Sequence, residues 1–265
     1  MPTERVGDIE LYYELHDFCE PWRAGRLPII FIHGLGGSHA MWLYQVPAFC
    51  DAFPVITVDL RAHGASGGGN ADFTIADMAR DLVRLMRTQG IERAHLVGLS
   101  LGGMVAQQFA LDYPLAVGRL VLADTFAGTP PGFADVMRNA FKFIEDNPMR
   151  AVAQSRISNA FSDRVDPVMR DYFIDQVSRN DKAAYVRAAR AAFGFDARDR
   201  LSEIAAPTLV IVGDEDRVTP PFCSEEIADG IRSAQLVRIP RGGHITNIEF
   251  PREFNAAVRE FLLAR

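Results

Sequence analysis

Short, mostly apolar runs recur along the chain, and segments with helically spaced apolar positions lie between them. A nearly continuous apolar run predicts a strand buried on both faces, which is typical of a parallel sheet covered by helices. Apolar and polar residues alternate in residues 9–13, and this pattern predicts an edge strand. The predicted strands are residues 9–13, 27–32, 55–58, 94–97, 120–123, 208–212 and 236–239.

Helical signals fill the intervals between these strands. Thr74 and Asp77 are placed as a capping box, in which each side chain bonds the backbone N–H of the other residue at the start of a helix. Pro251 stands at a favoured first helical position. The buried stripes of these two helices are predicted to be Ile75, Met78, Leu82, Val83 and Met86, and Phe254, Val258, Phe261 and Leu262. Alternating strands and helices predict an α/β fold, with a mostly parallel central sheet flanked by helices.

One long segment, residues 126–203, contains amphipathic helical pieces and no strand pattern. Helices inserted in this way predict a cap over the edge of the sheet where α/β folds bind their ligands. The length of 265 residues fits one large α/β domain with such an insertion. We therefore expect residues 1–125 and 204–265 to form the core and residues 126–203 to form a helical cap insertion.

Charge and composition argue against several classes of partner. The net charge of −6 provides no basic surface for nucleic acid or for an anionic membrane. No apolar run approaches the ~18 residues of a membrane span, and the amino terminus lacks the charged-then-apolar pattern of a secretory signal. The scattered cysteines Cys19, Cys50 and Cys223 are expected to be reduced thiols in a cytoplasmic protein.

The strongest chemical signal is the string Gly98-Leu99-Ser100-Leu101-Gly102, which lies between a predicted strand and a predicted helix. A Gly-x-Ser-x-Gly string in this setting is typical of a nucleophile elbow, a sharp turn that exposes a serine hydroxyl over the sheet. The flanking residues must be small, because a Cβ atom there would strike the strand or the helix. Ser100 is therefore the candidate nucleophile.

A serine hydroxyl needs a base that removes its proton and a carboxylate that orients the base. His244 is the one histidine that follows Ser100 in the sequence, and it lies in a glycine-containing loop after the last predicted strand. Two carboxylates compete for the third role, because Asp216 and Asp124 each follow a predicted strand at the carboxyl edge of the sheet. We expect Asp216 to be the acid and Asp124 to be a structural or pocket-edge residue.

An oxyanion hole requires N–H donors aimed at the developing negative charge. Leu101, directly after the nucleophile, is expected to supply one donor, and Leu35 in the glycine-rich residues 33–37 is expected to supply the other. Glycine-rich loops also hold phosphates, but the Gly-Lys-Ser/Thr and Gly-x-Gly-x-x-Gly sequences of nucleotide sites do not occur, so we expect no cofactor. His33 is expected to brace this loop through hydrogen bonds.

Asp59, Arg61, His63 and Ser66 crowd one turn after a predicted strand and could suggest a second active site. We interpret them as residues that fix the turn, with Asp59 and Arg61 hydrogen-bonded to backbone groups. The other histidines have no partners at metal-ligand spacing, so we expect no metal site.

Taken in order, these motifs resemble the α/β-hydrolase superfamily. The motifs that carry the resemblance are residues 33–34, 59–66, 98–102, 213–216 and 243–244, within a match that covers residues 9–125 and 205–263. The resemblance implies Ser100 as nucleophile, Asp216 as acid, His244 as base, and Leu35 and Leu101 as oxyanion donors. Residues 97–104 and 119–125 are similar to the 3-oxoadipate enol-lactonase-like branch.

A serine at the elbow implies an acyl-enzyme formed from an ester, lactone, thioester or activated ketone. We expect the substrate to be a small-molecule apolar or aromatic ester or lactone. Carbon–carbon bond hydrolases and cofactor-free perhydrolases of this fold use the same triad and stay open as alternatives. A small-molecule receptor that keeps the fold and an acyltransferase are two further alternatives. An arginine such as Arg138, Arg187 or Arg190 could hold a substrate carboxylate, but solvated or paired arginines are the simpler interpretation.

Overall fold

The computed structural model describes residues 3–20, 22, 26–68, 71–130 and 132–264. Its centre is an eight-stranded sheet with the order β1-β2-β4-β3-β5-β6-β7-β8. The pairs β1–β2 and β2–β4 are antiparallel, and all the other pairs are parallel. The strands are β1 (Thr3–Val6), β2 (Ile9–His16), β3 (Ile29–Ile32), β4 (Val55–Val58), β5 (Ala94–Leu99), β6 (Val117–Ala123), β7 (Thr208–Gly213) and β8 (Ala234–Ile239). The predicted α/β fold with a mostly parallel sheet is confirmed.

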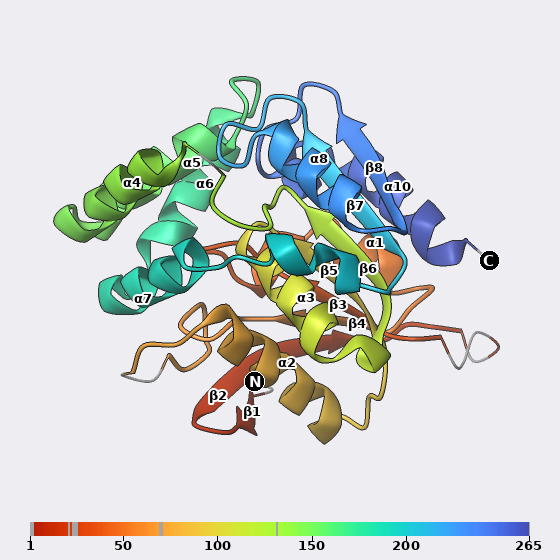
Figure 1. Ribbon diagram of the computed structural model, residues 1–265. Coiled ribbons are helices and arrows are strands. Elements are labelled where there is room, and N and C mark those ends of the chain that lie inside the picture. Colours follow the sequence, from red (N-terminus) through yellow and green to blue (C-terminus); the bar gives the residue numbers. More distant parts are fainter. Residues whose placement is uncertain (1–2, 21, 23–25, 69–70, 131, 265) are drawn as a thin grey trace.

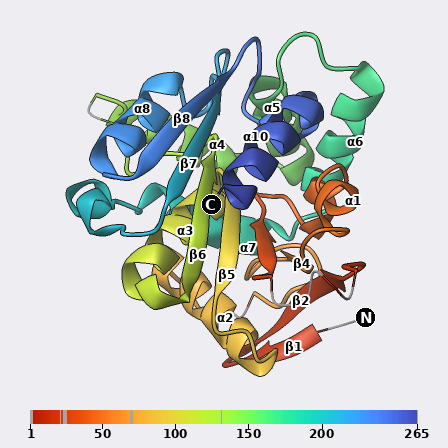
Figure 2. The same ribbon diagram turned by 90° about the vertical axis from the view of Figure 1, so that its right-hand side faces the viewer.

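Each face of the sheet carries its own apolar layer, because successive residues of a strand point to opposite faces. Ile30 and Ile32 of β3 belong to one layer, and Ile29 and Phe31 belong to the other. Figure 2 shows the helices of the two layers on opposite sides of the strands. They are α2 (Ile75–Thr88), α3 (Leu101–Asp112) and α8 (Pro221–Gly230) on one face, and α1 (Val46–Phe49) and α10 (Pro251–Leu263) on the other.

Four α-helices lie between β6 and β7 in the described part of the chain, and Figure 1 shows them gathered on one side of the molecule. These inserted helices are α4 (Ala134–Asp146), α5 (Met149–Ala160), α6 (Pro167–Ser178) and α7 (Lys182–Phe193). Gly128, before α4, and Asp196, after α7, form an isolated antiparallel β-bridge, so the segments on either side of the four helices lie next to each other. Ile157 of α5 and Phe173 of α6 are buried in the same apolar layer as Leu99 of β5. The insertion therefore packs at the end of a central strand.

The two helices with the clearest sequence signals form as predicted. Both hydrogen bonds of the capping box between Thr74 and Asp77 are present at the start of α2. The helix α10 begins at Pro251 and buries the four apolar residues predicted for it. The sequence pattern does not predict β1, because this strand is short, half-exposed and stabilised by its pairing with β2.

Some classes of site are absent from the part of the chain that the structure describes. It contains no helix that combines the length and apolarity needed to cross a membrane. No group of three or more His, Cys, Asp or Glu side chains is arranged there to hold a metal ion. Cys19, Cys50 and Cys223 are free thiols.

Candidate active site

Ser100 lies on a sharp turn between β5 and α3, at the carboxyl end of a central strand. Its backbone has φ 55° and ψ −116°, a conformation that costs a residue other than glycine about 1–3 kcal/mol. The Ser100 N–H donates to the carbonyl of Ala123 at 2.9 Å, and Thr125 Oγ1 donates to the carbonyl of Ser100 at 2.8 Å. The strand β6 and the loop after it thus hold the strained turn in place.

Glycine on both sides of Ser100 is a steric necessity. A Cβ atom on Gly98 would lie 2.2 Å from the carbonyl oxygen of Gly102. A Cβ atom on Gly102 would lie 2.0 Å from the carbonyl oxygen of Ile32 in β3. Both obstacles are backbone atoms of neighbouring elements, so they cannot rotate away. The small residues predicted at these two positions are confirmed as a requirement of the turn.

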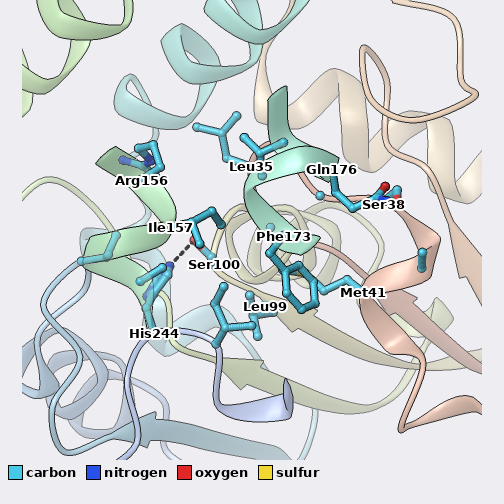
Figure 3. Close-up of a pocket in the computed structure, with 18 of the residues that line it drawn as sticks. Leu35, Ser38, Met41, Leu99, Ser100, Arg156, Ile157, Phe173, Gln176 and His244 are labelled. Carbon is cyan, nitrogen blue, oxygen red and sulfur yellow. Dashed lines mark hydrogen bonds between the residues drawn. The ribbon is translucent and has the colours of Figure 1, made fainter. Parts of the chain in front are cut away.

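Two further loops bring His244 and Asp216 to Ser100. His244 follows β8, and Asp216 lies between β7 and α8. His244 Nε2 is 2.9 Å from Ser100 Oγ, and His244 Nδ1 is 2.8 Å from Asp216 Oδ2. An ionised carboxylate only accepts hydrogen bonds, so Nδ1 carries the proton and Nε2 is free to accept the serine hydroxyl. All three side chains are buried, and Figure 3 shows the bond between Ser100 and His244.

The loop that carries Asp216 also orients its carboxylate. Asp216 Oδ1 accepts hydrogen bonds from the backbone N–H groups of Val218 and Thr219, at 2.8 and 2.9 Å. Thr219 Oγ1 donates to Asp216 Oδ2 at 2.8 Å and lies 3.2 Å from His244 Nδ1. The sequence reasoning missed Thr219. Its signal is a hydroxyl residue placed three positions after an aspartate, where it can turn back to the carboxylate.

Asp124, the competing carboxylate, is used elsewhere. Asp124 Oδ1 accepts a hydrogen bond from Gly213 N–H at 3.1 Å. Asp124 Oδ2 accepts from the N–H and the hydroxyl of Thr246, at 3.1 and 2.6 Å. Burial, together with the nearby negative charge of Asp216, raises the pKa of Asp124 well above its usual range. Asp124 therefore joins the start of the Asp216 loop to the residues after His244, and the structure brings Asp216 to the histidine.

The glycine-rich loop after β3 is braced by His33, as predicted. Leu60 N–H donates to His33 Nε2 at 2.9 Å, so Nδ1 carries the ring proton and donates to the carbonyl of Gly34 at 2.8 Å. Burial lowers the pKa of His33, which keeps the ring neutral. Leu35 lines the cavity at Ser100, and Leu101 is the first residue of α3. Within the described structure, the backbone N–H groups of Leu35 and Leu101 have no hydrogen-bond partner.

In the turn after β4, Asp59 fixes the backbone as predicted, but Arg61 does not. The Asp59 carboxylate accepts hydrogen bonds from two backbone N–H groups, at 2.6 and 2.7 Å, which confirms its predicted role. The prediction for Arg61 is wrong, because its guanidinium binds the carboxylates of Asp8 and Asp81 at 2.8–2.9 Å. Burial lowers the pKa of His63 to about 3, so this ring stays neutral.

A cavity of about 50 Å³ opens onto Ser100 and His244. Figure 3 shows that its walls come from the loop after β3, from β5, and from the inserted helices α5 and α6. The main apolar lining residues are Leu35, Met41, Leu99, Ile157, Phe173 and Val177. The volume is about a third of the ~150 Å³ cavity that holds one benzene molecule in an engineered protein. The cavity therefore suits a short apolar group.

Arg156 of α5 and His244 are the ionisable basic side chains among the described residues that line this cavity. Arg156 is half-buried, and its positive charge lies beside the buried Tyr185 hydroxyl, where it opposes the rise in the pKa of Tyr185 caused by burial. Arg138 and Arg190, two of the arginines considered from the sequence, are paired with nearby carboxylates, as the simpler interpretation predicted. The sequence reasoning missed Arg156, because its place on the cavity wall depends on how α5 docks against the sheet.

Comparison with known proteins shows the family of this chain. A family model described as the alpha/beta hydrolase fold matches residues 28–251. A protein of Variovorax paradoxus (strain S110) named "Putative carbamate hydrolase RutD" is 32% identical, over 95% of this chain and 96% of that protein. The chain belongs to the α/β-hydrolase family.

Two solved structures are similar over nearly the whole chain. The enol-lactonase from Burkholderia xenovorans LB400 has a TM-score of 0.92 and 29% identity, covering 99% of this chain and 100% of that one. Est816, described as an N-acyl homoserine lactone degrading enzyme, has a TM-score of 0.87 and 30% identity, covering 98% of this chain and 100% of that one. The similarity to the enol-lactonase-like branch, expected from the sequence, is confirmed.

Replacing Gly102 with alanine tests the steric requirement of the turn. We expect Gly102→Ala to lower the free energy of unfolding by about 3 kcal/mol or more, because its Cβ would press on a backbone oxygen. Gly67→Ala is the matched control, since a Cβ at that position meets its nearest neighbour at 3.5 Å. Urea unfolding of both variants measures the difference. Equal stability of the two variants would contradict the steric account.

Proposed function

We propose that the protein is a serine hydrolase that cleaves a carboxylic ester or lactone through an acyl-enzyme intermediate. The chain of hydrogen bonds from Ser100 through His244 to Asp216 carries this proposal, because it joins a nucleophile, a base and an orienting acid. The same proposal makes residues 126–203 the cap insertion that covers the site, on a core formed by residues 1–125 and 204–265. The apolar wall from α5 and α6 supports that division.

In the first half of the reaction, Ser100 Oγ attacks the carbonyl carbon of the substrate while its proton passes to His244 Nε2. The imidazolium that forms is stabilised by Asp216, which holds Nδ1–H. The bond from the carbonyl carbon to the leaving alcohol oxygen then breaks, and His244 gives its proton to that oxygen. In a lactone the leaving alcohol stays attached to the acyl group. The product of this half is the acyl ester of Ser100.

The negative charge on the carbonyl oxygen needs donors that are already in place. The unpartnered N–H groups of Leu35 and Leu101 support a role as oxyanion donors, since Leu35 lines the cavity at Ser100 and Leu101 follows Ser100 at the start of α3. Removing one such donor costs about 3–4 kcal/mol of barrier in a related chemistry. The neutral ring of His33 fixes the loop that presents Leu35.

In the second half, water replaces the alcohol. His244 Nε2 accepts a proton from a water molecule, whose oxygen attacks the acyl carbon and forms a second tetrahedral oxyanion at the same donors. The Ser100 oxygen leaves with the proton held by His244. The carboxylic acid product departs, and the enzyme returns to its starting state.

We expect the substrate to have a short acyl group that carries an acidic function. The small volume and the apolar walls of the cavity limit the length of the acyl chain. Arg156 adds a positive charge to the cavity wall, and a carboxylate on the substrate would complement this charge. The enol-lactonase and lactone-degrading neighbours support the ester and lactone class.

A carbamate is the second candidate substrate, because the name of the Variovorax relative assigns it to carbamate hydrolysis. The same triad attacks a carbamate carbonyl without any new group. Most of the cavity wall is apolar, however, and a small polar carbamate would leave that surface without a partner. The geometry therefore ranks esters and lactones first. Carbon–carbon cleavage, perhydrolysis and a receptor role use the same pocket, and no observation ranks them above hydrolysis.

Removing the nucleophile tests the proposed chemistry. We expect Ser100→Ala to lower kcat for p-nitrophenyl acetate by about 10⁴-fold or more, because no other group forms the acyl bond. Ser178→Ala, on α6 outside the cavity, is the control and should keep the native rate. Native-like turnover by folded Ser100→Ala would sink the acyl-enzyme mechanism.

Parallel variants of the two aspartates decide which one is the acid. We expect Asp216→Asn to lower kcat by about 10³- to 10⁴-fold, because an asparagine N–H facing His244 Nδ1 would favour the tautomer in which Nε2 carries the proton and cannot act as a base. Asp124→Asn should cost far less rate and should instead lower the free energy of unfolding by about 1–3 kcal/mol, since its backbone donors lose an acceptor. Steady-state kinetics and urea unfolding of both variants give the comparison. The reverse order of rates would assign the acid to Asp124.

Charge removal at Arg156 tests the proposed acidic substrate. We expect Arg156→Gln to lower kcat/KM for p-nitrophenyl hemisuccinate by about 10- to 100-fold and to change p-nitrophenyl butyrate little. Arg150→Gln is the matched control on the same helix, because Arg150 pairs with Asp175 and does not line the cavity. Equal losses on both esters would rule out charge recognition by Arg156.

A further inference from the structure

The turn that carries His244 is bonded directly to the inserted helices. His244 N–H donates to the carbonyl of Ala160, the last residue of α5, at 2.6 Å. The same helix contributes Arg156 and Ile157 to the cavity wall. The backbone of the histidine and one wall of the cavity therefore share a single support.

Glu249, in the short helix α9 (Thr246–Glu249), completes this connection. Glu249 Oε1 accepts a hydrogen bond from Gly243 N–H at 3.0 Å, on the residue before His244. Glu249 Oε2 accepts one from Ser162 N–H at 3.0 Å, just after the end of α5. One carboxylate thus bridges the histidine turn and the insertion.

Close packing around Gly243 shows how tightly the two segments meet. A Cβ atom at this position would lie 2.4 Å from Glu249 Oε1, 2.7 Å from the carbonyl oxygen of Ala160 and 2.8 Å from Ser162 N. These three atoms belong to the bridge itself. Only glycine allows the histidine turn to approach the insertion at this distance.

The loop after α5 is also fixed from its other side. Arg164 forms an ion pair at 2.8 Å with Glu215, which directly precedes Asp216 in the loop between β7 and α8. Arg170 Nη2 donates to the carbonyl of Ser162 at 2.9 Å, which holds the loop against the first turn of α6. Residues 160–164 therefore contact both loops that bring side chains to Ser100.

We propose that Glu249 is a positioning residue that holds His244 at hydrogen-bond distance from Ser100 by clasping its turn to the end of α5. This inference rests on the proposed function, in which His244 is the base. Glu249 has no bond to the reacting atoms and acts through the N–H groups of Gly243 and Ser162. Burial raises the pKa of Glu249, while these hydrogen bonds work in the opposite direction, as expected for a carboxylate used as an acceptor.

Glu249→Gln is the first test, because it keeps the shape and replaces one acceptor with an NH₂ group that faces an N–H donor. A displacement of the base of about 1 Å lowers the rate by about 100-fold, so we expect kcat for p-nitrophenyl acetate to fall about 10- to 100-fold. The rate of Ser100 phosphonylation by a fluorophosphonate should fall by the same factor. KM should stay within about twofold, because Glu249 does not line the cavity.

A second variant removes the hydrogen bond between Ser162 N–H and Glu249, and it does not depend on the folding of Glu249→Gln. Ser162→Pro deletes the N–H that Glu249 accepts, and Phe161, at φ −89° and ψ 147°, suits the residue before a proline. We expect a loss of kcat similar to that of Glu249→Gln, with no further loss in the double variant. Ser162→Ala is the control for loss of the side chain, because it keeps the N–H that Glu249 accepts, and it should keep a much higher kcat than Ser162→Pro.

Native kcat in folded Glu249→Gln or folded Ser162→Pro would overturn the positioning role. A rise in KM with unchanged kcat, or fully additive losses in the double variant, would overturn it as well. Failure of the proposed function has a different signature, because the native protein itself would then show no fluorophosphonate adduct on Ser100.

Discussion

The strained backbone of Ser100 is the constraint on which the rest of the site depends. A non-glycine residue at φ 55° persists only because β3, β6 and α3 crowd the turn from three sides. That crowding leaves room for glycine alone at Gly98 and Gly102. As a result, the Ser100 side chain forms no capping hydrogen bond with α3 and instead faces His244, in the loop after β8.

The carboxylates of Asp124, which is buried, and Glu249, which is half-buried, give the other loops their relative positions. Asp124 connects Gly213, at the start of the loop that carries Asp216, to Thr246, two residues after His244. Glu249 connects the turn before His244 to the end of α5. A hydrogen-bonded buried carboxylate is strongly preferred to an unpaired one, so these links resist independent motion of the loops. The geometry at Ser100 therefore reflects the packing of the insertion as well as the sheet.

Much of this arrangement is readable from the sequence because its signals are local. Apolar runs predict the strands, and the glycines around Ser100 predict the turn, since the reasons lie within a few neighbouring residues. Arg61 shows the limit, because its partners Asp8 and Asp81 are brought to it by the pairing of distant elements. Arg156 and Glu249 were missed for the same reason. Their roles depend on how the inserted helices dock, and no short pattern encodes that docking.

The most direct test of the central claim is the intact mass of the protein after brief incubation with a fluorophosphonate, followed by peptide mapping. An activated serine with preformed oxyanion donors predicts one adduct, located on Ser100 and absent when His244 is replaced by alanine. Folded native protein that gains no adduct, or an adduct on another residue, would contradict the account. The triad geometry would then describe a pocket without hydrolytic chemistry.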